Sequence, residues 1–207
     1  MPGPDFFSRL GLFVVQDFFS LDFCAALRRQ ARAVAHCPAT VVGPDERLDE
    51  TIRSTRRAQI APETVSLLHS RLVTIKPQLE QHFKVRLTGC EKPQLLVYRE
   101  SDFFIAHRDS SDYPDAPQDM RERKISIVVF LNAPSDEAVP ESYSGGSLTL
   151  YGLVDAPEWQ KYGFSLAPEP GLLIAFPSKI FHEVTKVTRG ERYTVVSWFV
   201  DSPSDVS

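Results

Sequence analysis

The chain has 207 residues, of which 43% are hydrophobic and 24% are charged, and it contains 14 Phe against 2 Met and 2 Trp. This composition excludes disorder over most of the chain and supports one sizeable, Phe-rich core rather than two independent ones. With 23 basic and 27 acidic residues the formal net charge is −4. No overall positive field therefore favours nucleic acid or an anionic membrane as a partner.

Three scattered cysteines, Cys24, Cys37 and Cys90, include no CxxC pair. They favour a reducing compartment over a disulfide framework, and we expect them to be small buried apolar residues. No run approaches the roughly 18 apolar residues that a membrane span needs. The sequence therefore predicts a soluble, cytoplasmic protein and leaves the oligomeric state open.

The first part of the chain predicts helices that cover one face of a sheet. Residues 12–19 form an extended run that ends at Ser20, a favourable N-cap, and the next segment has an apolar residue every three or four positions. A short strand is expected at residues 39–42. A second helical segment begins at Pro62, and Pro77 predicts a kink or a restart within it.

The rest of the chain consists of short extended runs separated by Pro, Gly, Asp and Ser clusters, which is typical of a β-sandwich or barrel. The longer connections, residues 110–123, 132–144 and 153–162, are where binding loops would lie. The expected strands are 94–99, 103–107, 124–131, 147–151, 171–176, 181–184 and 193–200.

Three of the five histidines have ordinary explanations. His36 follows the first helix, where a cation near the helix C-terminus is favourable. His69 and His82 lie off the apolar stripe of the second helical segment, so we expect solvated surface positions for them.

His107 and Asp109 end a strand-like run at a spacing of two, so their side chains project from the same face. One such pair is a weak signal, because it often arises by chance. His182, on a second strand-like run, is the third candidate. Two imidazoles and one carboxylate on a single face bind non-haem Fe(II) and leave its other coordination positions open.

Arg192 lies ten residues beyond His182 in a further strand-like run. Its guanidinium could hold the distal carboxylate of a ligand whose other end chelates the metal, through charge-assisted hydrogen bonds worth roughly 1.5–3 kcal/mol each. Arg189, next to Gly190, is the alternative residue for this role.

Three segments occur in a fixed order: YRESDFFIAHRD at 98–109, GGSL at 145–148, and PGLLIAFPSKIFHEVTKVTRGERYTVVSWF at 170–199. They resemble the Fe(II)- and 2-oxoglutarate-dependent dioxygenases of the prolyl 4-hydroxylase-like branch. The resemblance covers about residues 93–200 and implies a mainly β fold with N-terminal helices (α+β). In it, a double-stranded β-helix of the jelly-roll or cupin-like type forms a barrel, and residues 1–92 support one of its sheets within a single domain.

By this resemblance His107, Asp109 and His182 would bind Fe(II), and Arg192 would bind the far carboxylate of 2-oxoglutarate. Tyr98 would hydrogen-bond the same cosubstrate, with cross-strand packing as the alternative role. Dioxygen would be the other cosubstrate, and ascorbate an optional reductant.

Two positions refine the resemblance. Phe130 stands where some oxygen-sensing prolyl hydroxylases carry a tyrosine that touches 2-oxoglutarate, which argues against close kinship with that subgroup. Asp109 fills the ligand position that related halogenases leave to a small residue. Hydroxylation or demethylation is therefore favoured over halogenation.

Gly145-Gly146 lacks the GxGxxG spacing and predicts a tight turn or a close backbone approach instead of a phosphate loop. The loop at 110–123 is the first candidate for a lid. Two basic clusters are expected to be solvated, with contact to a substrate carboxylate or phosphate as the alternative. These clusters are Arg121, Arg123 and Lys124, and Arg53, Arg56 and Arg57.

The resemblance thus implies hydroxylation of a peptidyl, prolyl-type side chain, with conversion of 2-oxoglutarate to succinate and CO2. A free amino acid or another small metabolite is the alternative substrate. A metal- or ligand-binding module without turnover is an alternative function, against which the complete ligand set and Arg192 argue. A cupin-like enzyme that uses the metal without 2-oxoglutarate is a further alternative.

Overall fold

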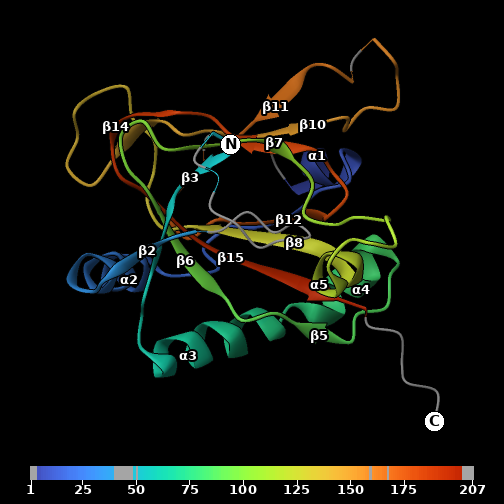
Figure 1. The fold of residues 1–207 in the computed structure, drawn as a ribbon, viewed down its shortest axis with the longest axis horizontal. Helices are drawn as coiled ribbons and strands as arrows, with labels where there is room; N and C mark the ends of the chain where they lie inside the picture. The colour runs from blue at the N-terminus through green and yellow to red at the C-terminus, as the bar shows by residue number, and fades with distance from the viewer. Residues whose placement is uncertain (1–3, 40–48, 50, 159, 167, 202–207) are drawn as a thin grey trace.

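The computed structural model describes residues 4–39, 49, 51–158, 160–166 and 168–201. Two β-sheets face each other, and helices cover the outer face of the larger one (Figure 1). In the described part of the chain, no helix is long and apolar enough to cross a membrane. The helices are α1 (Pro4–Arg9), α2 (Leu21–Ala33), α3 (Pro62–Val73), α4 (Lys76–Phe83) and α5 (Gln118–Glu122).

The larger sheet has the strand order β1-β12-β8-β15-β6-β4-β2, and β5 also pairs with β15. Its central strand β15 (Arg192–Val200) lies antiparallel between β8 (Arg123–Phe130) and β6 (Gln94–Tyr98). The other strands are β1 (Phe13–Val15), β2 (His36–Pro38), β4 (Arg56–Ala58), β5 (Gly89–Cys90) and β12 (Leu173–Pro177).

The smaller sheet has the order β11-β10-β13-β7-β3, and β14 and β9 form a separate two-stranded ribbon. None of these described ladders closes on itself, so the double-stranded β-helix is a sandwich of open sheets and not a closed barrel. The strands are β3 (Arg53–Ser54), β7 (Phe103–His107), β9 (Tyr143–Gly145), β10 (Leu148–Tyr151), β11 (Gly163–Ser165), β13 (His182–Val184) and β14 (Val187–Gly190).

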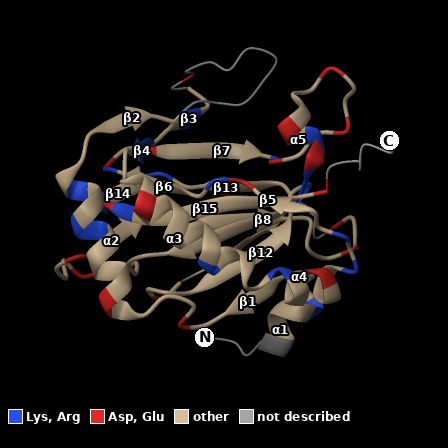
Figure 2. Cartoon of the chain, turned by 90° about the horizontal axis from the view of Figure 1, so that it is seen from below, with Lys and Arg blue, Asp and Glu red and all other residues tan. Residues whose placement is uncertain are grey.

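The alternation of side chains along β15 separates the core from the site. Tyr193, Val195 and Phe199 belong to the hydrophobic cluster that the sheet shares with α2, α3 and α4. The residues that alternate with them along the strand face the smaller sheet; these are Arg192, Thr194, Val196 and Trp198. The predicted helical cover of one face is therefore confirmed. Figure 2 shows that charged residues concentrate on helices and loops, while the central strands of the larger sheet carry few.

Several predicted boundaries shift for local reasons. The strand expected at 12–19 covers only Phe13–Val15, because Asp17 takes a left-handed φ of 52° that ends the extended run. The strand expected at 39–42 is instead β2, which ends at Pro38, and residues 40–42 lie outside the described residues. Pro77 marks a restart, since it occupies the first turn of α4, where no N–H is needed.

Ser20 caps α2 as expected, accepting a hydrogen bond from the Phe23 backbone N–H at 3.3 Å. The prediction of small buried apolar cysteines holds for Cys24 alone. Cys37 and Cys90 are half-buried, and all three cysteines are free thiols.

The prediction of solvated histidines on the helices is wrong, because both of these side chains reach neighbouring strands. His82 is half-buried and packs edge-to-face on Phe13, with ring centres 5.4 Å apart. Nε2 of His69 lies 3.0 Å from the Cys90 carbonyl oxygen. His36 begins β2, and its Nε2 lies 2.7 Å from the Ala31 carbonyl oxygen near the end of α2.

Candidate functional site

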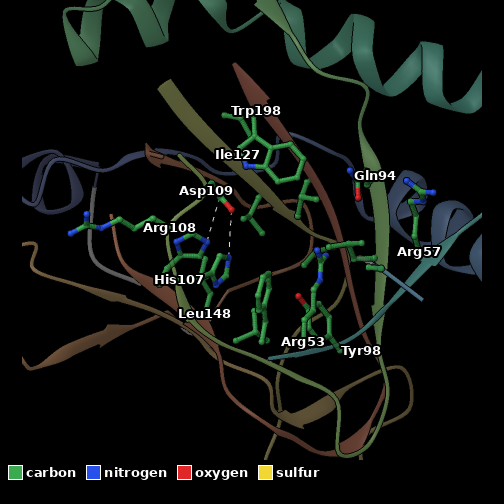
Figure 3. Close-up of a pocket in the computed structure, with 18 of the residues that line it drawn as sticks. Arg53, Arg57, Gln94, Tyr98, His107, Arg108, Asp109, Ile127, Leu148 and Trp198 are labelled. Carbon is green, nitrogen blue, oxygen red and sulfur yellow. Dashed lines mark ion pairs between the residues drawn. The ribbon is translucent and has the colours of Figure 1, made fainter. Parts of the chain in front are cut away.

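Three potential metal ligands converge between the two sheets. His107 ends β7 and is paired in register with His182, which begins β13, so the ladder itself places the two imidazoles side by side. The Asp109 Oδ1 atom lies 3.5 Å from Nε2 of His107, and its Oδ2 atom lies 3.5 Å from Nε2 of His182 (Figure 3). All candidate ligand atoms lie within 4.8 Å of one another. The structure thus brings together the three side chains that the sequence singled out.

Each imidazole is oriented by its own strand. Nδ1 of His107 lies 2.8 Å from the Ile105 carbonyl oxygen, and Nδ1 of His182 lies 2.9 Å from the Ile180 carbonyl oxygen. Because a carbonyl can only accept, the Nδ1 atoms carry the protons and donate. Both Nε2 lone pairs are left facing Asp109, as in a metal site whose ligands are held by an outer shell of hydrogen bonds.

The carboxylate is held in the ionised form. Burial by itself would raise the pKa of Asp109, but His182, His107 and the Ser126 hydroxyl, which donates to Oδ2 at 2.7 Å, keep that pKa well below its usual range. Burial lowers the pKa of His182 to about 4. At neutral pH the cluster therefore offers a negative Asp109 carboxylate and a neutral His182 imidazole, the protonation states that bind a cation.

Aromatic rings enclose the two imidazoles. Phe104 stacks on His107 with ring centres 3.5 Å apart, and Phe176 meets His182 edge-on at 4.9 Å. These contacts restrict both imidazole rings and reduce the access of water to the cluster.

A cavity of about 490 Å³ extends from this cluster along β15. At its far end Arg192 is paired in register with Tyr98, and its guanidinium carbon lies 5.1 Å from the centre of that ring and 5.3 Å from the Phe130 ring. Arg192 is only 1% exposed, so the predicted anion-binding cation is buried at the end of the cavity farthest along β15 from Trp198.

Two buried polar atoms of this region, Nε of Arg192 and Oγ1 of Thr194, have no hydrogen-bond partner among the described residues. Leaving a buried polar group unpaired costs about 1–3 kcal/mol. Both residues line the cavity, which makes a polar ligand the natural partner of these atoms.

The GGSL segment packs directly behind Arg192. Gly146 has φ +60°, and a Cβ there would lie 2.8 Å from Val187 Cγ2 and 3.1 Å from Arg192 Cδ. The predicted close backbone approach is therefore confirmed. Tyr143, also 1% exposed, hydrogen-bonds Arg192. Burial raises the pKa of Tyr143 and the guanidinium opposes that shift.

Arg189 does not reach the cavity. Its guanidinium donates to the Ser135 carbonyl at 2.8 Å and to the Asp136 carbonyl at 3.1 Å, so it fixes the 132–144 loop. Of the two arginines that the sequence suggested as anion ligands, Arg192 is the one that lines the cavity.

The first basic cluster divides. Arg121 and Lys124 are exposed, but the solvated position expected for Arg123 is wrong, because its side chain enters the cavity. Arg123 binds the Glu91 carboxylate with two hydrogen bonds of 2.6 and 2.8 Å, and its guanidinium carbon lies 3.9 Å from the centre of the Trp198 ring.

The second cluster also divides. Arg53 is half-buried and lines the cavity, with its guanidinium carbon 4.7 Å from the centre of the Phe104 ring. Arg56 pairs with Asp102 at 2.7 Å, and Arg57 is exposed at the cavity rim. In the 110–123 loop, α5 contributes part of the cavity wall, whereas the lid role of this loop stays a prediction.

Three contributing residues were not found from the sequence. Ser126 interrupts an apolar run in β8, and Thr194 lies two residues from Arg192 and so on the same face of β15. The sequence could therefore have indicated both residues. Tyr143 follows a connection without periodic pattern, and only the tertiary structure brings it to Arg192.

Comparisons with known proteins show the family to which the chain belongs. A family model described as the 2OG-Fe(II) oxygenase superfamily matches residues 93–200, just over half of the chain. A PKHD-type hydroxylase of Shewanella frigidimarina is 30% identical over 112 residues, which is 53% of this chain and 43% of that protein. A PKHD-type hydroxylase of Synechococcus is 37% identical over 101 residues, or 49% and 39%. The chain spans less than half the length of these curated relatives.

Solved structures share the fold. A Pseudomonas putida prolyl-4-hydroxylase aligns with a TM-score of 0.70 at 23% identity, covering 93% of this chain and 94% of that one. A Trichoplax adhaerens prolyl hydroxylase, in complex with a hypoxia inducible factor peptide fragment, aligns with a TM-score of 0.71 at 19% identity, covering 92% and 84%. The chain therefore belongs to the 2OG-Fe(II) oxygenase superfamily, and its fold is that of the prolyl 4-hydroxylase-like branch.

Proposed function

We propose that the protein is a 2-oxoglutarate-dependent hydroxylase that holds Fe(II) with His107, Asp109 and His182 and acts on a peptidyl, prolyl-type side chain. One observation carries the proposal: a single cavity joins this ligand set to a buried Arg192 whose Nε has no partner among the described residues. A metal at one end and a cation at the other suit a cosubstrate with two acidic ends.

The donor set fits iron. Two neutral imidazole nitrogens and one ionised carboxylate on a single face are the ligands of non-haem Fe(II) oxygenases, and they leave positions for a chelating cosubstrate and dioxygen. The bound iron would supply dioxygen activation, coupled to oxidative decarboxylation of 2-oxoglutarate to succinate and CO2. The chain's own part is to fix the donors through Ile105, Ile180 and Ser126.

At the other end of the cavity, Arg192 would bind the far carboxylate of 2-oxoglutarate. The Thr194 hydroxyl would donate to the same ligand, and Tyr98 would hydrogen-bond it from the neighbouring strand. Phe130, beside Arg192, supplies an apolar wall without a hydroxyl. Binding there would satisfy both orphan polar atoms and remove their desolvation cost.

The substrate would enter beside Trp198, where Ile127 and Met120 also line the cavity. This apolar wall would position a C–H bond near the metal and exclude water. A peptide substrate is supported by the Trichoplax neighbour, a prolyl hydroxylase that was solved with a peptide, and by the curated relatives, which are named hydroxylases.

The test measures succinate formed from 2-oxoglutarate with Fe(II), with and without ascorbate, in the presence of proline-containing peptides or free amino acids. We expect peptide-stimulated succinate formation by the wild-type protein and none by His182→Ala. If the wild-type protein binds neither Fe(II) nor 2-oxoglutarate under anaerobic conditions, the proposal fails. Stimulation by free amino acids alone would reject the peptide substrate and leave the oxygenase.

A further inference from the structure

A second cavity, of about 250 Å³, adjoins the main one and shares Arg57 and Gln94 with it. Its walls come from the end of β4, the first turn of α3 and the start of β6, and they include the apolar residues Ile60, Val65 and Pro93. Figure 3 shows Gln94 and Arg57 on the opposite side of the main cavity from His107 and Asp109. The two cavities are therefore adjacent, and a line from the metal cluster past Gln94 to the second cavity defines the peptide path considered below.

The strand register gives the length of this path. Ser126 of β8, which holds Asp109, is paired with Trp198 of β15, and Val196 of β15 is paired with Gln94 of β6. Strand β6 in turn pairs with β4, which carries Arg57. From β8 to β4 there are three interstrand spacings, about 14 Å, and Gln94 is level with Val128, two residues or about 7 Å along β8 from Ser126. The path is therefore about 16 Å long, which about five residues of an extended peptide span.

The second cavity is lined by two cations, Arg57 and Lys92, and by no acidic residue. Both side chains are exposed, and no ion pair recorded for the described part of the chain involves either of them. Arg123 of the main cavity differs, because Glu91 and Asp119 neutralise it. A chain with a net charge of −4 therefore presents a local positive patch along this path.

Arg53, which lines the main cavity, adds to this positive region. Its pKa is lowered, first by burial and also by the nearby charges of Arg57 and Arg123. The second cavity combines charge that suits a carboxylate, an apolar floor that suits the methylenes of an acidic side chain, and Gln94 at the junction for hydrogen bonds to a peptide backbone.

We propose that this second cavity is a subsite for an aspartate or glutamate side chain that lies about five residues to one side of the prolyl-type residue in the main cavity. The inference rests on the proposed peptide hydroxylase function and adds a substrate class to it: a peptide with an acidic flank. Arg57 and Lys92 bind the carboxylate, and Gln94 guides the backbone between the two cavities.

The experiment uses the full chain loaded with Fe(II) and 2-oxoglutarate under anaerobic conditions. It captures peptides from a synthetic library with a fixed central proline and randomised flanks. We expect Asp and Glu to be enriched over Lys and Arg on one flank, about four to six residues from the proline. In the double variant Arg57→Gln/Lys92→Gln this enrichment falls about five- to tenfold, because two solvent-exposed ion pairs of modest strength are lost.

The matched control is Arg29→Gln/Arg86→Gln, which removes the same charge from exposed positions that line neither cavity. It retains the acidic enrichment, and raised salt weakens that enrichment in the wild-type protein. Absence of acidic enrichment, or enrichment that survives the Arg57/Lys92 double variant, overturns the subsite. Failure of the proposed function is distinguishable, because it shows as absent binding of Fe(II) and 2-oxoglutarate before any peptide is added, or as capture of no peptide at all.

Discussion

The two ends of the main cavity differ in how their polar atoms are satisfied. At the metal end, His107, His182 and Asp109 each have a protein partner that fixes their orientation: two backbone carbonyls and the Ser126 hydroxyl. At the other end, Arg192 and Thr194 keep buried polar atoms without a partner among the described residues. The first end is arranged by the protein alone, and we propose that a ligand completes the second.

This difference has a thermodynamic consequence. Internal hydrogen bonds at the metal end reduce the reorganisation that metal binding requires. Unpaired groups at the Arg192 end destabilise the unliganded protein, and the ligand that satisfies them recovers this free energy as affinity. Substitutions at the first end should therefore affect metal affinity, and substitutions at the second should affect cosubstrate affinity.

The largest effect is expected from Asp109→Ala, which removes the only carboxylate of the ligand set. Fe(II) binding and succinate formation should both be lost, because two neutral imidazoles bind the cation far more weakly. Anaerobic Fe(II) titration and a succinate assay measure this. His69→Ala, a histidine outside the cavity, should retain both activities. Iron-dependent turnover by Asp109→Ala would contradict the assignment of the metal end.

Arg192→Met should raise KM for 2-oxoglutarate about 100-fold, because charge-assisted hydrogen bonds worth about 3 kcal/mol in total are lost. Fe(II) affinity without cosubstrate should be unchanged. Arg189→Met is the matched control, since that guanidinium binds loop carbonyls instead of lining the cavity. Steady-state kinetics at varied 2-oxoglutarate provide the measurement. Equal effects of the two substitutions would remove the distinction between these arginines.

Ser126→Ala tests whether the hydrogen-bonded shell matters at the metal end. Without its hydroxyl partner Asp109 is less well oriented, and Fe(II) affinity should fall about tenfold. KM for 2-oxoglutarate should stay within about twofold, whereas Ser66→Ala, on an exposed position of α3, should change neither quantity. A selective loss of cosubstrate affinity would show that the two ends are not independent.

Thr194→Val should have the smallest effect, and it should lower the affinity for 2-oxoglutarate while raising the stability of the unliganded protein. The affinity for 2-oxoglutarate should fall about fivefold, because one hydrogen bond of about 1 kcal/mol is lost. The unliganded protein should become about 1 kcal/mol more stable, because a buried hydroxyl without a partner is replaced by a methyl group. Denaturant unfolding and 2-oxoglutarate titration measure the two changes. A fall in the free energy of unfolding would mean that the hydroxyl is satisfied in the unliganded state.

The alternation of side chains along strands allowed part of the site to be predicted from the sequence. The spacing of His107 and Asp109 predicted a shared face. In the structure β7 ends at His107, and Asp109 lies in the bend that follows, where its backbone N–H donates to the Ser178 carbonyl. Strand parity does connect Arg192 with Thr194. The positions of Arg123 and Arg189 could not be predicted in this way. Both lie at or near strand ends among polar residues, and only the packing shows that one stacks on Trp198 inside the cavity while the other fixes a loop.

The sequence by itself determined the mainly β class, the helical cover of one sheet and the identity of the three potential metal ligands, because these follow from local periodicity, spacing and residue chemistry. The tertiary structure decided what depends on partners distant in the chain. The His107–His182 pairing joins strands 75 residues apart, Tyr143 reaches Arg192, and the second cavity lies where β4, β6 and α3 meet. No local pattern encodes these contacts, because each depends on the register and packing of the whole sheet.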